Sequence, residues 1–200
     1  SNNKKILISG NFNLVNGYIN KSKIFYNLEK EGYFKRSPDF KRELSVIIND
    51  SEKNFYKFFE MLTKLINNFP SENFLIRPHP LEKTEIWMEK FKNFKNVEIS
   101  KEGNINEQLI NSKILIHNSC TSAFHAHFYR IPIISYEPIK SESSYGDPAN
   151  ELSERTHNID ELIEKVQQKI NLVDNSSTNQ KKNIFDNKVF ISVSKYSSEI

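Results

Sequence analysis

The chain has 200 residues, which is enough for one domain of ordinary size with a substantial core. Its 28 basic and 25 acidic residues leave a net charge of +3 and are mixed along the sequence, so no basic stripe indicates nucleic-acid binding. No apolar run approaches the roughly 20 residues that cross a bilayer, which excludes a membrane-spanning protein.

The first part of the chain is predicted to contain one strand followed by helices. The strand covers residues 4–10, and the loop after it contains Asn11 and Asn13. Such a loop usually lies at the ligand-binding edge of an α/β sheet, although an ordinary Asn-rich connection fits the pattern equally well. Apolar spacing predicts helices over residues 21–34, 40–48 and 55–69, the last two forming one long helix that is continuous or interrupted.

The second part alternates short apolar runs with helical patterns. Strands are predicted over residues 74–77, 97–99, 113–117 and 133–136, and helices over 81–94, 104–111, 121–129 and 158–170. Residues 140–147 are polar, and 174–183 are expected to be a linker, while 184–200 fit either a helix or a strand. This alternation predicts an α/β fold with a Rossmann-like parallel sheet and helices on both faces. The expected domain covers residues 1–172, with a linker and C-terminal segment over 173–200.

Two segments join a short apolar run to an abrupt polar end. One runs from Phe74 through Arg77-Pro78-His79-Pro80, and the other from Ile114 through Asn118-Ser119-Cys120-Thr121-Ser122. Buried parallel strands end in this way when they deliver a ligand site at their carboxyl edge. We therefore expect the two segments to lie at the same edge of the sheet.

The polar ends of these segments carry donors suited to a phosphate. Arg77 and His79 supply positive charge or N–H donors, and two prolines fix the backbone around His79. The second segment supplies hydroxyl and N–H groups where a helix is predicted to begin, with Asn118 and Ser119 as N-cap candidates followed by Thr121 and Ser122. The alternatives are a loop histidine that caps a carbonyl and hydroxyls that only cap the helix.

Other reactive side chains give weaker patterns. His125 and His127 lie two apart on a predicted helix and point in different directions, and no carboxylate cluster joins them to His117, so no metal site is predicted. Cys120 is the single cysteine, which favours a reducing, cytosolic setting. It could be a nucleophile, but a small residue packed in the turn is the preferred interpretation. The glycine-rich fingerprint and the P-loop are both missing from the sequence, so any phosphate would have to be held by hydroxyls, by helix N-terminal N–H groups and by Arg77 and His79. No cofactor is expected.

The order of these motifs resembles the C-terminal half of the bacterial surface carbohydrate biosynthesis proteins. The similarity covers roughly residues 4–170 and is carried by Arg77-Pro78-His79-Pro80 with Trp87, by residues 116–122, by 132–138 and by 150–153. These proteins in turn resemble the wider group of GT-B glycosyltransferases with an Arg/Lys-Pro-His-Pro motif. That group includes capsule Kdo transferases, bacterial sialyltransferases and the glycerophosphotransferases of teichoic acid synthesis.

The resemblance implies a nucleotide-sugar-binding domain that forms one half of a GT-B fold. Its donor would be a CMP-sugar or a similar nucleotide-activated group, with His79 as the catalytic residue at the donor phosphate. Arg77, Ser119, Thr121 and Ser122 would hold phosphate or ribose, and Asn118, His125 and Glu137 are further substrate-binding candidates. His125 departs from the family pattern, because relatives tend to have Glu there to clamp the ribose hydroxyls.

The resemblance also implies partners. They are a nucleotide-activated donor, a glycan acceptor and a preceding N-terminal GT-B domain, which the start at Ser1 without Met leads us to expect outside this chain. That domain would supply the catalytic base, and the enzyme would be cytoplasmic, at the inner face of the membrane. Two rivals stay open: a nucleotide-sugar epimerase of the GT-B type, and a non-catalytic nucleotide- or carbohydrate-binding module.

Overall fold

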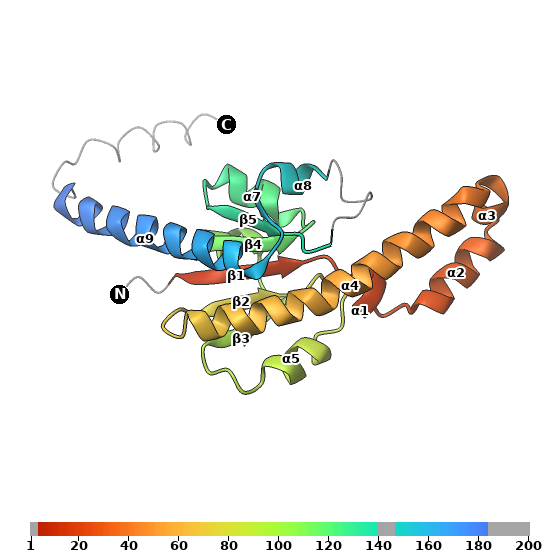
Figure 1. Cartoon of the computed structure of the whole chain (residues 1–200), viewed down its shortest axis with the longest axis horizontal. Coiled ribbons are helices and arrows are strands. Elements are labelled where there is room, and N and C mark those ends of the chain that lie inside the picture. The colour runs from red at the N-terminus through yellow and green to blue at the C-terminus, as the bar shows by residue number, and fades with distance from the viewer. Residues whose placement is uncertain (1–3, 140–146, 184–200) are drawn as a thin grey trace, which may run out of the picture.

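The computed structural model describes residues 4–139 and 147–183 and contains one parallel sheet (Figure 1). Its strand order is β3-β2-β1-β4-β5-β6, and every neighbouring pair is parallel. The strands are β1 (Lys5–Gly10), β2 (Phe74–Arg77), β3 (Val97–Ile99), β4 (Ser112–Asn118), β5 (Ile133–Tyr136) and β6 (Glu154–Thr156). The predicted Rossmann-like α/β fold is therefore confirmed.

The central strands are buried on both faces, as their continuous apolar runs require. In β1, Ile6, Leu7 and Ile8 are all fully buried. Ile8 pairs with Ile76 of β2 and with Ile116 of β4, so the three central strands end in register at the same edge. The segments that follow β1, β2 and β4 therefore lie close together at this edge.

Helices cover both faces of the sheet. One face packs against α4 (Pro38–Asn68), α5 (Glu85–Phe91) and α9 (Ile159–Asn183), whose side chains share a core with Ile6 and Ile8. The other face packs against α6 (Ile105–Ile110), α7 (Ser122–Phe128) and α8 (Pro148–Glu151), around Leu7 and Leu115. Successive side chains of β1 thus point to opposite faces of the sheet and belong to two separate cores.

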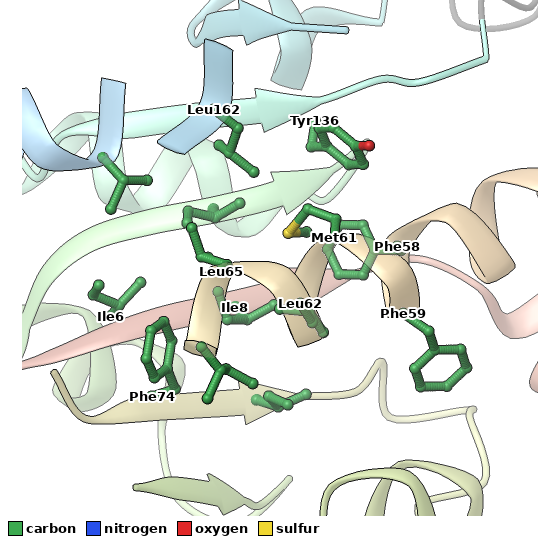
Figure 2. Close-up of a cluster of buried hydrophobic side chains, with 14 of the residues drawn as sticks. Ile6, Ile8, Phe58, Phe59, Met61, Leu62, Leu65, Phe74, Tyr136 and Leu162 are labelled. Carbon is green, nitrogen blue, oxygen red and sulfur yellow. The ribbon is translucent and has the colours of Figure 1, made fainter. Parts of the chain in front are cut away.

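The long helix α4 supplies much of the larger core. Its residues Phe58, Leu62 and Leu65 are fully buried and lie against the sheet (Figure 2). Phe59 also packs on the ring of Trp87, with the two centroids 4.7 Å apart. The aromatic stripe of this helix is therefore core, as its spacing predicts.

Several element boundaries differ from the prediction. The long helix is continuous from Pro38 to Asn68, and a short helix, α1 (Asn13–Asn16), occupies part of the expected loop. The predicted helix over 21–34 is broken into α2 (Lys21–Lys30) and α3 (Tyr33–Arg36), because Gly32 has a left-handed φ of 75°.

The C-terminal boundary is also different. Helix α9 continues to Asn183, so residues 174–183, which were expected to form a linker, are helical. The segments 140–146 and 184–200, expected to be polar loop and undecided respectively, lie outside the described residues. None of the helices in the described part of the chain has the length and apolar character that crossing a membrane requires.

Candidate functional site

A cavity of about 220 Å³ lies where the polar ends of three strands meet. The strand order reverses between β1 and β4, and ligands of open α/β sheets bind in the crevice at such a switch point. The lining comes from β1, from the end of β2 and the loop after it, from the start of α6, and from the turn between β4 and α7 with the first residue of α7. Its residues are Ser9, Arg77, Pro78, His79, Pro80, Ile105, Cys120, Thr121 and Ser122. The structure thus brings together the two segments that the sequence singles out.

The hydroxyl of Ser122 is buried in this lining without a partner. Ser122 is 6% exposed, and its Oγ makes no hydrogen bond to any described residue. Leaving a buried hydroxyl unsatisfied costs about 1–3 kcal/mol, so such groups need an explanation. A ligand oxygen in the cavity would supply the missing partner.

His79 presents a defined ring to the same cavity. Its Nδ1 accepts the backbone N–H of Leu81 at 3.2 Å, so in the neutral ring the proton lies on Nε2. The half-buried ring can therefore offer an N–H donor to a ligand.

Arg77 lines the cavity, but its guanidinium is partly committed elsewhere. Two of its N–H groups donate to the backbone oxygens of Glu102 and Gly103, at 3.0 and 3.1 Å. Burial lowers the pKa of Arg77 from its ordinary value, while the nearby Cys120 acts in the opposite direction. Arg77 therefore holds the loop after β3 in place and contributes positive charge to the cavity wall.

Sequence reasoning missed Glu82, which lies directly behind the His79 loop. Its carboxylate is fully buried and accepts four N–H groups, from the backbones of Phe12 and His79 and the side chains of Asn16 and Trp87. Among the described residues, no Lys, Arg or His nitrogen pairs with it. The only signal in the sequence is an acidic residue three positions after His79.

The turn after β4 departs from the predicted N-cap. Asn118 ends the strand and donates its side-chain amide to the backbone oxygen of Tyr136 at 2.7 Å. Ser119 has a left-handed φ of 47° and exchanges hydrogen bonds with the Asn150 side chain. The N-cap of α7 is Thr121, without a side-chain cap. Since α7 has only seven residues, the side-chain donors matter more here than a helix dipole.

His117 anchors this turn from inside the protein. Its Nδ1 accepts the backbone N–H of Cys120 at 3.3 Å, and its Nε2 lies 2.7 Å from the hydroxyl of Ser153, which itself donates to the oxygen of Ala149. The ring therefore carries its proton on Nε2 and donates it to Ser153. Burial lowers the pKa of His117 to about 4, although Asp147 opposes the shift.

Six of the sequence candidates lie outside the cavity lining, namely Asn118 and Ser119, whose contacts are given above, and four others. Glu137 is buried and forms two hydrogen bonds with Arg155, and His125 is exposed beside Asn106. Asn11 is exposed, and Asn13 lines a separate apolar pocket with Leu81. These four residues do not join Ser122 and His79 in the lining, although Asn11 and Glu137 directly follow β1 and β5 at the same edge of the sheet.

Cys120 belongs to the lining and lies against the first strand. Its Sγ is 3.0 Å from the Oγ of Ser9, and its side chain is buried.

In the part of the chain that the structure describes, no group of His, Cys, Asp or Glu residues is arranged to hold a metal ion.

The chain was compared with protein-family models, with curated proteins and with solved structures, and none of the three comparisons gave a match. The fold is accordingly identified as a six-stranded parallel α/β sheet of the Rossmann-like kind, without assignment to a family.

Proposed function

We propose that this cavity binds the phosphate of a nucleotide-activated sugar, and that the chain is the donor-binding domain of a GT-B-type glycosyltransferase. The acceptor would be a cell-surface polysaccharide precursor. The observation that carries the proposal is the buried, unpartnered hydroxyl of Ser122 in a cavity at the switch point of the sheet.

The chemistry of the lining supports a phosphate ligand. His79 can donate from Nε2, Thr121 and Ser122 can donate from their hydroxyls, and Arg77 adds positive charge. No Asp or Glu is among the lining residues, so no carboxylate side chain faces a bound anion directly. Donors placed in this way would stabilise the charge that develops on the leaving phosphate during glycosyl transfer.

The size of the cavity supports a ligand that extends beyond this chain. Its volume of about 220 Å³ is below the range of roughly 300–1,000 Å³ usual for small-molecule sites. A phosphate with part of a ribose would fit, and the rest of the donor would lie outside the cavity. A preceding N-terminal domain would cover it there and bring the acceptor and the base, as the motif resemblance implies.

The single cysteine gives a direct test of occupancy. Because Cys120 lines the cavity, a bound phosphate should slow its alkylation by iodoacetamide. We expect protection by nucleotides such as CMP, CDP or UDP, weaker protection by inorganic phosphate, and none by cytidine. The variant His79→Ala should lose most of the protection while keeping its melting temperature. If none of these nucleotides slows the alkylation of Cys120, the proposal is overturned.

One alternative has support from the same lining. This alternative is a non-catalytic nucleotide-binding module. Such a module needs no catalytic base, and no lining residue is a carboxylate that could act as the base for an acceptor hydroxyl. Nucleotide binding without turnover, in the protein joined to any preceding domain and across a panel of donors and acceptors, would favour this alternative.

A further inference from the structure

We infer that Glu82 is a positioning residue for His79 and holds its imidazole in the form that donates from Nε2. The inference rests on the proposed function where it concerns phosphate binding. It assigns a role to a buried carboxylate that does not line the proposed cavity.

The segment from His79 to Glu82 is closed by three hydrogen bonds. The backbone N–H of Glu82 donates to the oxygen of His79 at 2.8 Å, and the backbone N–H of His79 donates to Oε1 of Glu82 at 3.3 Å. Inside this reciprocal pair, the N–H of Leu81 donates to Nδ1 of His79 at 3.2 Å. The same logic operates in a capping box, where a residue three positions on accepts the first N–H.

The carboxylate also fixes this turn to the rest of the protein. Its Oε1 accepts the N–H of Phe12 at 2.9 Å, which joins the loop after β1 to the loop after β2. Its Oε2 accepts the indole N–H of Trp87 at 3.1 Å, which joins the turn to α5. The backbone oxygen of Glu82 further accepts Nζ of Lys101 at 2.7 Å. One side chain thus anchors the whole wall that carries His79.

The burial of this carboxylate indicates a specific role. Burying a charge without a paired cation is costly, and the cost is offset only when several donors satisfy the oxygens. Here four N–H groups do so, and each is a donor that an apolar replacement would leave unsatisfied. A glutamine would replace one oxygen by an NH₂ group that faces donors, so even this isosteric change should open the turn.

The closed turn determines which nitrogen of the neutral His79 ring carries the proton. As long as the turn is closed, Nδ1 is occupied by the Leu81 N–H, and the ring can meet a ligand only through the Nε2 proton. If the turn opens, both neutral tautomers become accessible, and one of them presents a lone pair to an anionic oxygen. Glu82 would therefore favour phosphate without touching it.

The test uses long-range ¹H–¹⁵N correlation spectra of the intact chain, which distinguish the two tautomers. Wild type should show His79 with the proton on Nε2. Glu82→Gln should show a mixture of tautomers and lose about tenfold in affinity for cytidine monophosphate, the size of one hydrogen bond, with affinity for cytidine unchanged. Trp87→Phe is the matched control, because it removes a different donor from the same carboxylate and should alter neither the tautomer nor the affinity.

The outcomes separate this inference from the proposed function. A single Nε2–H tautomer in both wild type and Glu82→Gln, or the Nδ1–H tautomer in wild type, would overturn the positioning role. A shifted tautomer in Glu82→Gln without any binding of cytidine monophosphate to wild type would support the positioning role and contradict the proposed function. If Glu82→Gln does not fold, Glu82→Asp replaces it, since the shorter carboxylate should also release the His79 N–H.

Discussion

Acid should destabilise this protein through one buried ring. His117 is fully buried, and burial lowers its pKa from 6.5 to about 4. Between these two values the unfolded chain binds a proton that the folded chain does not bind. The contribution of His117 to the free energy of unfolding therefore falls as the pH falls through this window, and it becomes constant below the folded-state pKa.

The size of the effect follows from the width of that window. One pH unit inside it corresponds to about 1.4 kcal/mol, so the loss due to His117 should be about 2 kcal/mol at about pH 5 and about 3 kcal/mol at about pH 4. Its main physical cause is the burial of the ring, which disfavours the charged imidazolium. Protonating Nδ1 would also displace the N–H of Cys120, which this nitrogen accepts at 3.3 Å.

Urea unfolding followed by the fluorescence of Trp87, the only tryptophan, measures this loss. In His117→Gln, the amide N–H₂ can still donate to Ser153, and position 117 no longer binds a proton in the window. This variant should be less stable than wild type near neutral pH but should lose about 2 kcal/mol less between about pH 7.5 and about pH 5. His127→Gln, at an exposed position, is the control and should follow wild type. Parallel pH profiles for wild type and His117→Gln would refute the reasoning.

Two further changes test how the site is built. Ser122→Ala removes a buried hydroxyl that has no protein partner, so the free energy of unfolding should stay level or rise by up to about 1 kcal/mol, while nucleotide affinity falls by about 1.5–3 kcal/mol; calorimetry showing unchanged affinity would mean that no ligand uses this hydroxyl. Glu137→Gln weakens the ion pair between buried Glu137 and partly exposed Arg155 and should lower the free energy of unfolding by about 1–3 kcal/mol. Nucleotide affinity should be unchanged, because Glu137 lies outside the cavity. Chemical denaturation measures the change in stability, and calorimetry measures the nucleotide affinity. Reduced affinity with unchanged stability would mean that Glu137 contacts the ligand.

The parts of the fold that could be predicted are those whose signal is local. The apolar runs of β1, β2 and β4 and the helical period of α4 are each contained in one stretch of sequence. Strand β6 was missed because Glu154-Arg155-Thr156 has no apolar run. It becomes a strand through its neighbour, since it pairs with β5 and the Thr156 hydroxyl donates to the oxygen of Ser135.

In the candidate site, too, the features that could be predicted have a local signal in the sequence, and the others depend on distant residues. The meeting of the His79 loop with Thr121 and Ser122 could be expected, because parallel strands that pair in register deliver their ends to one edge. Glu82 could not be recognised, since an acidic residue after a loop normally faces solvent. Its burial depends on the N–H of Phe12, which is 70 positions away in the chain. Ser119 was misplaced as a helix cap because the left-handed turn there depends on Asn150, another distant residue.

The two edges of the sheet bear on how the protein behaves when concentrated. Both edge strands, β3 and β6, span only three residues, and they lie at opposite ends of the strand order. Glu98 on β3 pairs with Lys5, and Glu154 on β6 pairs with Lys169, so each edge carries charged side chains. A long, flat, apolar edge can recruit a strand from another molecule, whereas short charged edges oppose such pairing. This sheet should therefore resist edge-to-edge aggregation at the millimolar concentrations that NMR of the His79 ring requires.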